Sequence, residues 1–220
     1  MPRRAILFDL DGTLVDTAPD LHAALNVALA AQGRAAVPIE GVRAMVGDGA
    51  RELVKRGLAA TGGMTEVAVA AGTALFLDHY TANLSRLSRP FPGVADALAA
   101  LKARGCRLAV CTNKQVGFSE RLLADLALAP FFDAIVGGDS LAVRKPDPGH
   151  ILGALARLGA GADAGIMVGD STNDVRAARG AGVPVIAVSF GYTAIPPREL
   201  GADALIDGFA ELPAAVARFS

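Results

Sequence analysis

Two aspartates, Asp9 and Asp11, follow a short apolar run and are the residues best suited to chemistry in this chain of 220 residues. The run from Ala5 to Phe8 predicts a buried strand, and Gly12 lets the backbone turn sharply after the second acid. Ligands bind at the carboxyl ends of strands in open α/β sheets. Two neighbouring carboxylates repel each other unless a cation compensates them, and Mg²⁺ is the usual oxygen-bound cation. The alternative interpretation is a capped turn with two solvated acids.

Polar residues also follow later apolar runs, which we expect to be parallel strands of the same sheet. Thr112 and Asn113 follow the run 107–111, and their hydroxyl, amide and backbone N–H groups suit phosphate oxygens. An ordinary helix N-cap uses the same residue types. Lys145 precedes a Pro-Asp-Pro turn. It is surface charge by default and binds phosphate only if its loop points it at the acids.

A second acidic pair, Asp170 and Asp174, follows the apolar run 165–168 at another expected strand-to-helix turn. In a parallel sheet these acids lie at the same edge as Asp9 and Asp11. Four such carboxylates are strongly self-repelling unless a metal ion and a lysine compensate them. The three histidines have no partner at ligand spacing, and we expect them to be structural.

Composition favours a globular protein of one large or two modest domains, with 52% hydrophobic and 20% charged residues. The net charge is −1 and no Lys/Arg-rich block occurs, so nucleic acid and membrane surfaces are not expected partners. Asp9 interrupts the first apolar run too early for a signal peptide, and glycines and prolines break the longest uncharged stretch. We therefore expect a cytoplasmic protein. Cys106 and Cys111 lie about 16 Å apart along one expected strand, too far for a disulfide.

The hydrophobic pattern divides the chain into an α/β core and a helical insertion. Helical spacing dominates between residues 18 and 84, whereas helices alternate with short apolar strands from Pro90 onward, which predicts parallel βαβ units. We expect a core of residues 1–16 and 85–220 and a helical cap of residues 17–84, placed to act as a lid. The expected helices cover residues 18–32, 49–60, 65–84, 94–104, 116–126, 148–158, 173–181 and 211–218, and the expected strands 5–8, 107–111, 134–136, 165–168, 183–188 and 205–206.

Together these motifs resemble the haloacid-dehalogenase superfamily of phosphohydrolases. Its first motif, D-x-D-G-T-L-x-D, matches residues 9–16, and its later motifs correspond in order to Thr112, Lys145 and the G-D-x-x-x-D pattern at residues 169–174. The resemblance spans the chain. It implies a Rossmann-like α/β fold, with a parallel sheet in the strand order 3-2-1-4-5 and an α-helical cap inserted after the first motif.

The resemblance also implies a role for each motif residue. Asp9 would be the nucleophile that takes the phosphoryl group, and Asp11 would protonate the leaving alcohol and then activate water. Charge on the transferring group would be neutralised by Mg²⁺, Lys145 and Thr112, with Asn113 as a further phosphate-binding residue. The implied ligands of Mg²⁺ are Asp9, the backbone carbonyl of Asp11, and Asp170, with Asp174 in support.

Within the superfamily, residues 7–21, 46–51 and 189–192 are similar to bacterial phosphoglycolate phosphatases. This implies hydrolysis of 2-phosphoglycolate to glycolate and phosphate by a monomer or homodimer. A substrate with a carboxylate needs a second cation, and Arg51 at an expected cap-helix start is the first candidate, although it is equally well a solvated helix residue.

Other functions stay open. Similar caps serve other small phosphate esters, including sugar phosphates and N-acetylmuramate 6-phosphate, and also pyrophosphate. A sugar phosphomutase would usually have a histidine where Leu21 stands, and a dehalogenase would lack the second acid, Asp11. A non-catalytic phosphate-binding module would need no general acid.

Overall fold

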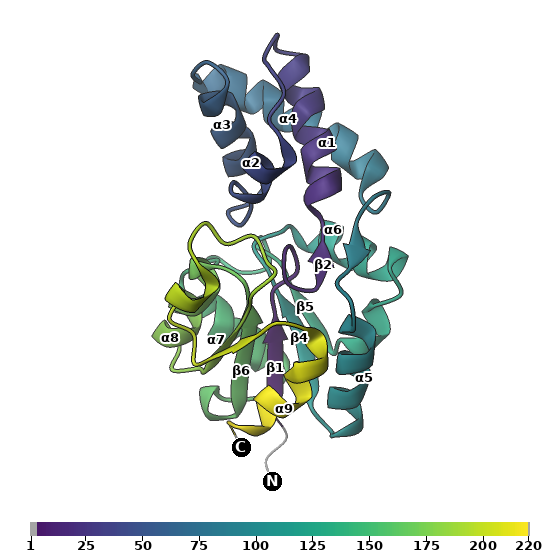
Figure 1. The fold of residues 1–220 in the computed structure, drawn as a ribbon, viewed down its shortest axis with the longest axis vertical. Coiled ribbons are helices and arrows are strands. Elements are labelled where there is room, and N and C mark those ends of the chain that lie inside the picture. Colours follow the sequence, from purple (N-terminus) through teal and green to yellow (C-terminus); the bar gives the residue numbers. More distant parts are fainter. Residues whose placement is uncertain (1–3, 220) are drawn as a thin grey trace.

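A six-stranded parallel sheet forms the centre of the computed structural model, which describes residues 4–219 (Figure 1). When the strands of this sheet alone are numbered 1 to 6 along the chain, their order across the sheet is 3-2-1-4-5-6. The predicted order 3-2-1-4-5 is therefore confirmed, with a sixth strand at one edge. From edge to edge the strands are β5 (Ala134–Val136), β4 (Arg107–Cys111), β1 (Ala5–Phe8), β6 (Gly165–Gly169), β7 (Val185–Val188) and β8 (Ala204–Ile206).

The central strand β1 is buried on both faces, as expected for a parallel sheet covered by helices. Ala5 and Leu7 belong to one buried apolar cluster, and Ile6 and Phe8 belong to another. Helices α7 (Pro148–Arg157) and α8 (Thr172–Gly180) contribute to the first cluster, whereas helices on the opposite face contribute to the second. These opposite helices are α5 (Val94–Ala103), α6 (Val116–Asp125) and α9 (Leu212–Ala217).

The strand register brings the polar segments to one edge of the sheet. Phe8 at the end of β1 pairs with Val110 on β4 and with Val168 on β6. The residues that follow these three strands, including Asp9, Thr112 and Asp170, therefore meet at the carboxyl edge.

Four helices stand beyond this carboxyl edge, and we call them the helical layer (Figure 1). They are α1 (Ala18–Ala30), α2 (Ile39–Arg43), α3 (Ala50–Ala60) and α4 (Glu66–Asn83). Helix α4 packs against both α1 and α3. The buried apolar cluster of the layer continues into one face of the sheet through residues such as Leu14 and Leu21.

An antiparallel ribbon of β2 (Val15–Asp16) and β3 (Arg89–Pro90) joins the layer to the sheet. The division of the chain into a core and a cap at residues 17 and 84 stays a prediction. The ribbon and α2 were not predicted, because they are short and lack the continuous apolar run that identified the equally short buried strands.

Most expected elements occur within a few residues of their predicted ends. Strand β7 begins at Val185 instead of residue 183, and the closing helix α9 is shorter than expected. Cys106 and Cys111 are buried and free, as expected. Among residues 4–219, no helix has the length and apolar character needed to cross a membrane. Short 3₁₀ helices occur at Ala129–Phe131, Ala162–Ala164, Pro197–Glu199 and Phe209–Glu211.

Candidate active site

The turn after β1 fixes the position of the first two acids. The backbone N–H of Asp9 still donates to the carbonyl of Val168 over 2.9 Å, so this residue is held by the sheet itself. Gly12 adopts a φ of +83°, and a Cβ atom there would lie 2.5 Å from Oδ2 of Asp170. Only glycine combines this backbone conformation with so close an approach.

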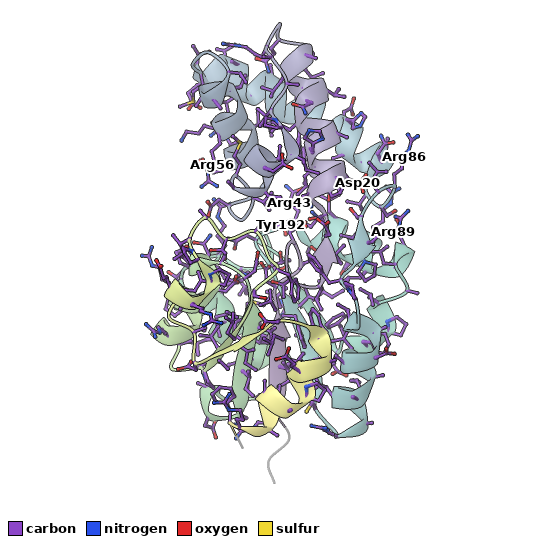
Figure 2. All side chains as sticks on the ribbon, viewed as in Figure 1. Asp20, Arg43, Arg56, Arg86, Arg89 and Tyr192 are labelled. Atoms are coloured by element: carbon purple, nitrogen blue, oxygen red, sulfur yellow. The ribbon has the colours of Figure 1, made fainter. Side chains whose placement is uncertain are left out.

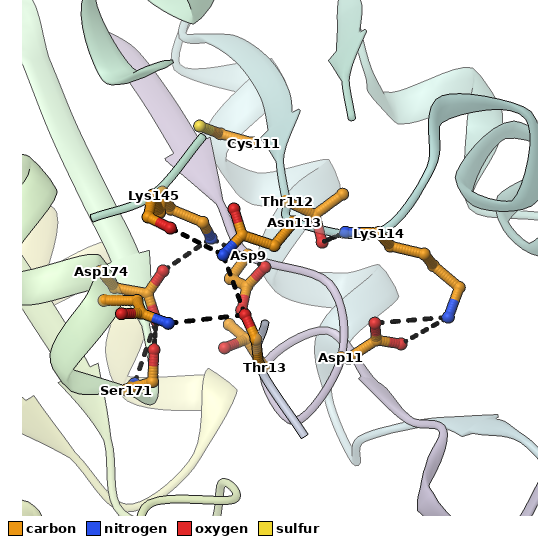
Figure 3. A network of polar contacts seen from close by, with 12 residues as sticks. Asp9, Asp11, Thr13, Cys111, Thr112, Asn113, Lys114, Lys145, Ser171 and Asp174 are labelled. Atoms are coloured by element: carbon orange, nitrogen blue, oxygen red, sulfur yellow. Dashed lines mark hydrogen bonds and ion pairs between the residues drawn. The ribbon is translucent and has the colours of Figure 1, made fainter. Parts of the chain in front are cut away.

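Lys145 bridges two of the acids. Its ammonium lies 2.9 Å from Oδ1 of Asp9 and 2.7 Å from Oδ1 of Asp174 (Figure 3). The Lys145 side chain is 2% exposed. Burial raises the pKa of Asp9 from its ordinary value of 3.8 to about 6, although the charge of Lys145 opposes this shift. The loop therefore points Lys145 into the acidic cluster, which was the condition for giving it a functional role.

The second acidic pair is held by the start of α8 and by neighbouring loops. Oδ2 of Asp174 accepts from the backbone N–H of Ser171 over 3.0 Å and from its hydroxyl over 2.7 Å, as part of a capping box. Asp170 accepts from the Thr13 hydroxyl over 3.0 Å and from the backbone N–H of Tyr192 over 2.6 Å. Burial, together with the charges of Asp9 and Asp174, raises the pKa of Asp170 well above its ordinary range.

A divalent cation fits this cluster on charge and geometry. Carboxylate oxygens of Asp9, Asp170 and Asp174 all lie within 4.8 Å of one another, and all three residues are buried. The ammonium of Lys145 opposes only part of their negative charge, and burial, followed by the charges of the neighbouring acids, raises the pKa values of Asp9 and Asp170. Hard cations such as Mg²⁺ prefer ligands of this type.

The carboxylate of Asp11 points to a different set of partners. It lies 3.0 and 3.3 Å from the ammonium of Lys114 and accepts from the Thr17 hydroxyl over 2.7 Å (Figure 3). The Lys114 ammonium lies 4.7 Å from the centre of the Tyr80 ring, which belongs to α4. The Asp11 carboxylate is outside the cluster formed by Asp9, Asp170 and Asp174. Sequence reasoning overlooked Lys114, although it directly follows Thr112 and Asn113.

Thr112 and Asn113 stand between the sheet and the helical layer. The Thr112 hydroxyl is buried and accepts from the backbone N–H of Lys114 over 3.2 Å. The amide nitrogen of Asn113 donates to the carbonyls of Lys145 and Gly47, both over 2.9 Å. Asn113 was predicted to bind phosphate, but in this structure its amide N–H groups hold two loops together.

The loop before α3 is docked onto the sheet side of the molecule. Besides the bond from Asn113 to Gly47, the amide nitrogen of Asn173 donates to Oδ1 of Asp48 over 2.8 Å. The same aspartate forms an ion pair with Arg56. The helical layer is thus held close over the carboxyl edge.

A cavity of about 450 Å³ lies between the helical layer and the sheet. Asp9, Asp11 and Thr112 line it from the sheet side. Arg51 also lines the cavity, but its guanidinium pairs with Glu66 and its side chain is 52% exposed. The structure therefore gives no contact that assigns Arg51 to substrate binding. The helical layer contributes an apolar and aromatic wall formed by Leu21, Leu53, Phe76, Leu77 and Tyr80, and Phe118 of α6 adds to it from the sheet side.

Tyr192 connects the site to the entrance of the helical layer. Its hydroxyl donates to Asp16 and accepts from the backbone N–H of Ala18 over 2.9 Å. Arg43 forms a 3.3 Å ion pair with Asp16 and lies beside the Tyr192 ring (Figure 2). These contacts were not predicted. Tyr192 lies in the segment 189–192 that carries part of the resemblance, and at the neighbouring Gly191 a Cβ atom would overlap Asp170.

Comparisons with known proteins agree with the fold and the motifs. The model of the haloacid dehalogenase-like hydrolase family matches residues 6–188. The chain is 48% identical over 211 residues to phosphoglycolate phosphatase of Caulobacter vibrioides, covering 96% of this chain and 89% of that one. It is 47% identical over 213 residues to phosphoglycolate phosphatase of Agrobacterium fabrum, with coverages of 96% and 91%. The crystal structure of a predicted phosphoglycolate phosphatase from Haemophilus somnus matches with a TM-score of 0.93 at 32% identity, with coverages of 98% and 99%.

Proposed function

The chain belongs to the haloacid dehalogenase-like hydrolase family and is a phosphoric monoester hydrolase, and on that premise we propose that it hydrolyses 2-phosphoglycolate. The products are glycolate and phosphate, and the reaction passes through an aspartyl-phosphate on Asp9. The observation that carries the proposal is the pairing of Asp9 with Lys145, over 2.9 Å, beside a cavity that both Asp9 and Asp11 line.

Asp9 acts as the nucleophile in the first step. A carboxylate oxygen of Asp9 attacks phosphorus, the bond between phosphorus and the ester oxygen breaks, and Asp11 gives a proton to that oxygen as glycolate leaves. In the second step water attacks the same phosphorus, Asp11 takes its proton, and the bond to Asp9 breaks. Asp11 lies two residues after the nucleophile, and Thr17 and Lys114 hold its carboxylate in place.

The transferring phosphoryl group is bound by Lys145, by the hydroxyl of Thr112 and by the segment at Asn113. Lys145 is buried and fixed between Asp9 and Asp174, so its charge is oriented before the substrate arrives. The segment after Thr112 runs toward the start of α6 and lines the cavity through Asn113 and Lys114.

Mg²⁺ is the proposed cofactor. Asp9, Asp170 and the backbone carbonyl of Asp11 would hold it. Asp174, the second acid of the pair Asp170 and Asp174, would support these ligands. When bound, it would compensate the clustered carboxylates and the negative charge of the phosphoryl group. We further propose a cytoplasmic enzyme that acts as a monomer or homodimer.

A larger phosphate ester, such as a sugar phosphate, is the second candidate substrate. The observation that favours it is the cavity of about 450 Å³, with its apolar wall, because this volume lies within the range of pockets that hold drug-sized ligands. The relatives named as phosphoglycolate phosphatases favour the two-carbon acid instead.

A substrate panel separates the two candidates. The purified protein is assayed with Mg²⁺ on 2-phosphoglycolate, glucose 6-phosphate, N-acetylmuramate 6-phosphate and pyrophosphate, and the substrates are ranked by kcat/KM. We expect 2-phosphoglycolate to rank first. A higher kcat/KM for one of the other substrates would replace it as the proposed substrate.

A further inference from the structure

We propose that Lys114 determines substrate specificity by binding a carboxylate located one carbon beyond the ester oxygen. The substrate class is thus a short phosphate monoester with a second anionic group close to the bond that breaks. This inference deepens the proposed function and rests on it.

Lys114 lies in the cavity beside the reacting groups. It follows Thr112 by two residues, and its side chain is only 6% exposed. Its ammonium is 3.0 Å from Oδ1 of Asp11, and both residues line the cavity together with Asp9. A charge in such a sheltered position interacts with a ligand more strongly than one in water.

The other cations that line the cavity or its floor are engaged or exposed. Lys145 is held between Asp9 and Asp174. Arg51 is half exposed and paired with Glu66, and Arg144 is exposed at the surface. Within the described part of the cavity wall, Lys114 is therefore the buried cation, and its carboxylate partner is Asp11, itself one of the reacting groups.

The order of the groups matches the order of atoms in the substrate. The phosphoryl group lies at Asp9, and the ester oxygen lies at Asp11, which protonates it. Because Lys114 contacts Asp11 directly, a carboxylate separated from the ester oxygen by a single carbon reaches the Lys114 ammonium. A neutral substrate offers no anionic group for this contact.

The helical layer completes the subsite. The Tyr80 ring from α4 covers the Lys114 ammonium at 4.7 Å, a geometry that stabilises a cation and fixes its position. Lys114 comes from the sheet side and Tyr80 from the helical layer, so both parts of the molecule contribute to the subsite.

The test compares two esters of similar length in the Lys114→Met variant. One is 2-phosphoglycolate, and the other is 2-hydroxyethyl phosphate, in which a neutral hydroxymethyl group replaces the carboxylate. We expect kcat/KM for 2-phosphoglycolate to fall by about 10²-fold more than for the neutral ester, because a buried charge-assisted bond is lost for one substrate only. Lys114→Arg, which keeps the charge, should restore part of the preference.

A binding measurement gives a readout independent of turnover. The non-hydrolysable phosphonate 3-phosphonopropionate should bind the Lys114→Met variant much more weakly than the wild type, while inorganic phosphate binds both with similar affinity. The matched control is Arg51→Met, which should not change the ratio of kcat/KM values between the two esters. Thermal unfolding checks that each variant is folded.

The outcomes distinguish this inference from the proposed function. If the wild type does not prefer 2-phosphoglycolate over 2-hydroxyethyl phosphate, the proposed substrate is wrong. If the wild type has the preference and Lys114→Met keeps it, Lys114 does not bind the carboxylate. A selective loss in Arg51→Met would assign the carboxylate to that residue instead.

Discussion

The backbone N–H of Tyr192 donates to Oδ2 of Asp170 over 2.6 Å. The same tyrosine donates its hydroxyl to Asp16, at the entrance to the helical layer, and accepts from the backbone N–H of Ala18. One residue therefore holds a carboxylate of the acidic cluster through its backbone and the base of the helical layer through its side chain. Tyr192 thus connects the acidic cluster to the base of the helical layer by hydrogen bonds at both ends.

Tyr192→Phe should lower the free energy of unfolding by about 1–3 kcal/mol. The variant keeps the backbone bond to Asp170 but leaves Asp16 and the N–H of Ala18 without the hydroxyl. Urea denaturation measures the loss. The control is Tyr80→Phe, because the Tyr80 hydroxyl is buried with no hydrogen-bond partner among residues 4–219, so its removal should be neutral or stabilising. Similar losses in both variants would contradict this assignment.

Asp20→Ala should be more destabilising than an ordinary surface substitution, by about 2–4 kcal/mol. The buried Asp20 carboxylate, at the base of α1 (Figure 2), accepts from the backbone N–H groups of Leu87 and Ser88 and from the Ser88 hydroxyl, over 2.7 to 3.0 Å. The alanine variant leaves these buried donors unsatisfied. Asp78→Ala, at an exposed position of α4, is the control and should change the melting temperature little. Equal shifts in the two variants would rule out this role for Asp20.

Mg²⁺ should stabilise the protein more at pH 7.5 than at pH 5. Burial raises the pKa of Asp9 from 3.8 to about 6, so the folded protein without metal takes up a proton as pH falls through 6, before the unfolded chain does. The cost of holding the buried Asp9 carboxylate ionised is thus fully present above pH 6, and lowering the pH from there toward 4 relieves it. Mg²⁺ would offset the same cost by binding the ionised acids. Thermal unfolding with and without Mg²⁺ measures the effect, and an increase in melting temperature that is equal at both pH values would contradict it.

The sequence was sufficient to predict the sheet and the acids at its edge. Asp9, Thr112 and Asp170 each come at the end of an apolar run. The run identifies a strand, and the polar residue that follows it marks the carboxyl end of that strand, so both can be read from neighbouring residues. The convergence of Lys145 on Asp9 and Asp174 also agrees with the prediction.

The sequence could not show which cations are committed to which acids. Arg51 and Lys114 are both single basic residues near a helix start, and the structure distinguishes them through Glu66 and Asp11. The contacts of Tyr192 with Asp16 join residues 176 positions apart. Such a pairing depends on how the helical layer sits over the sheet, which no local pattern records.

The central claim is that Asp9 accepts the phosphoryl group of 2-phosphoglycolate. The most direct measurement is phosphate release from this ester by the wild type and by Asp9→Asn, each with and without Mg²⁺, with thermal unfolding as a check on the fold. We predict turnover by the wild type that depends on Mg²⁺, and no measurable turnover by a folded Asp9→Asn variant, because an amide cannot accept the group. Phosphate release by Asp9→Asn near the wild-type rate would contradict the account.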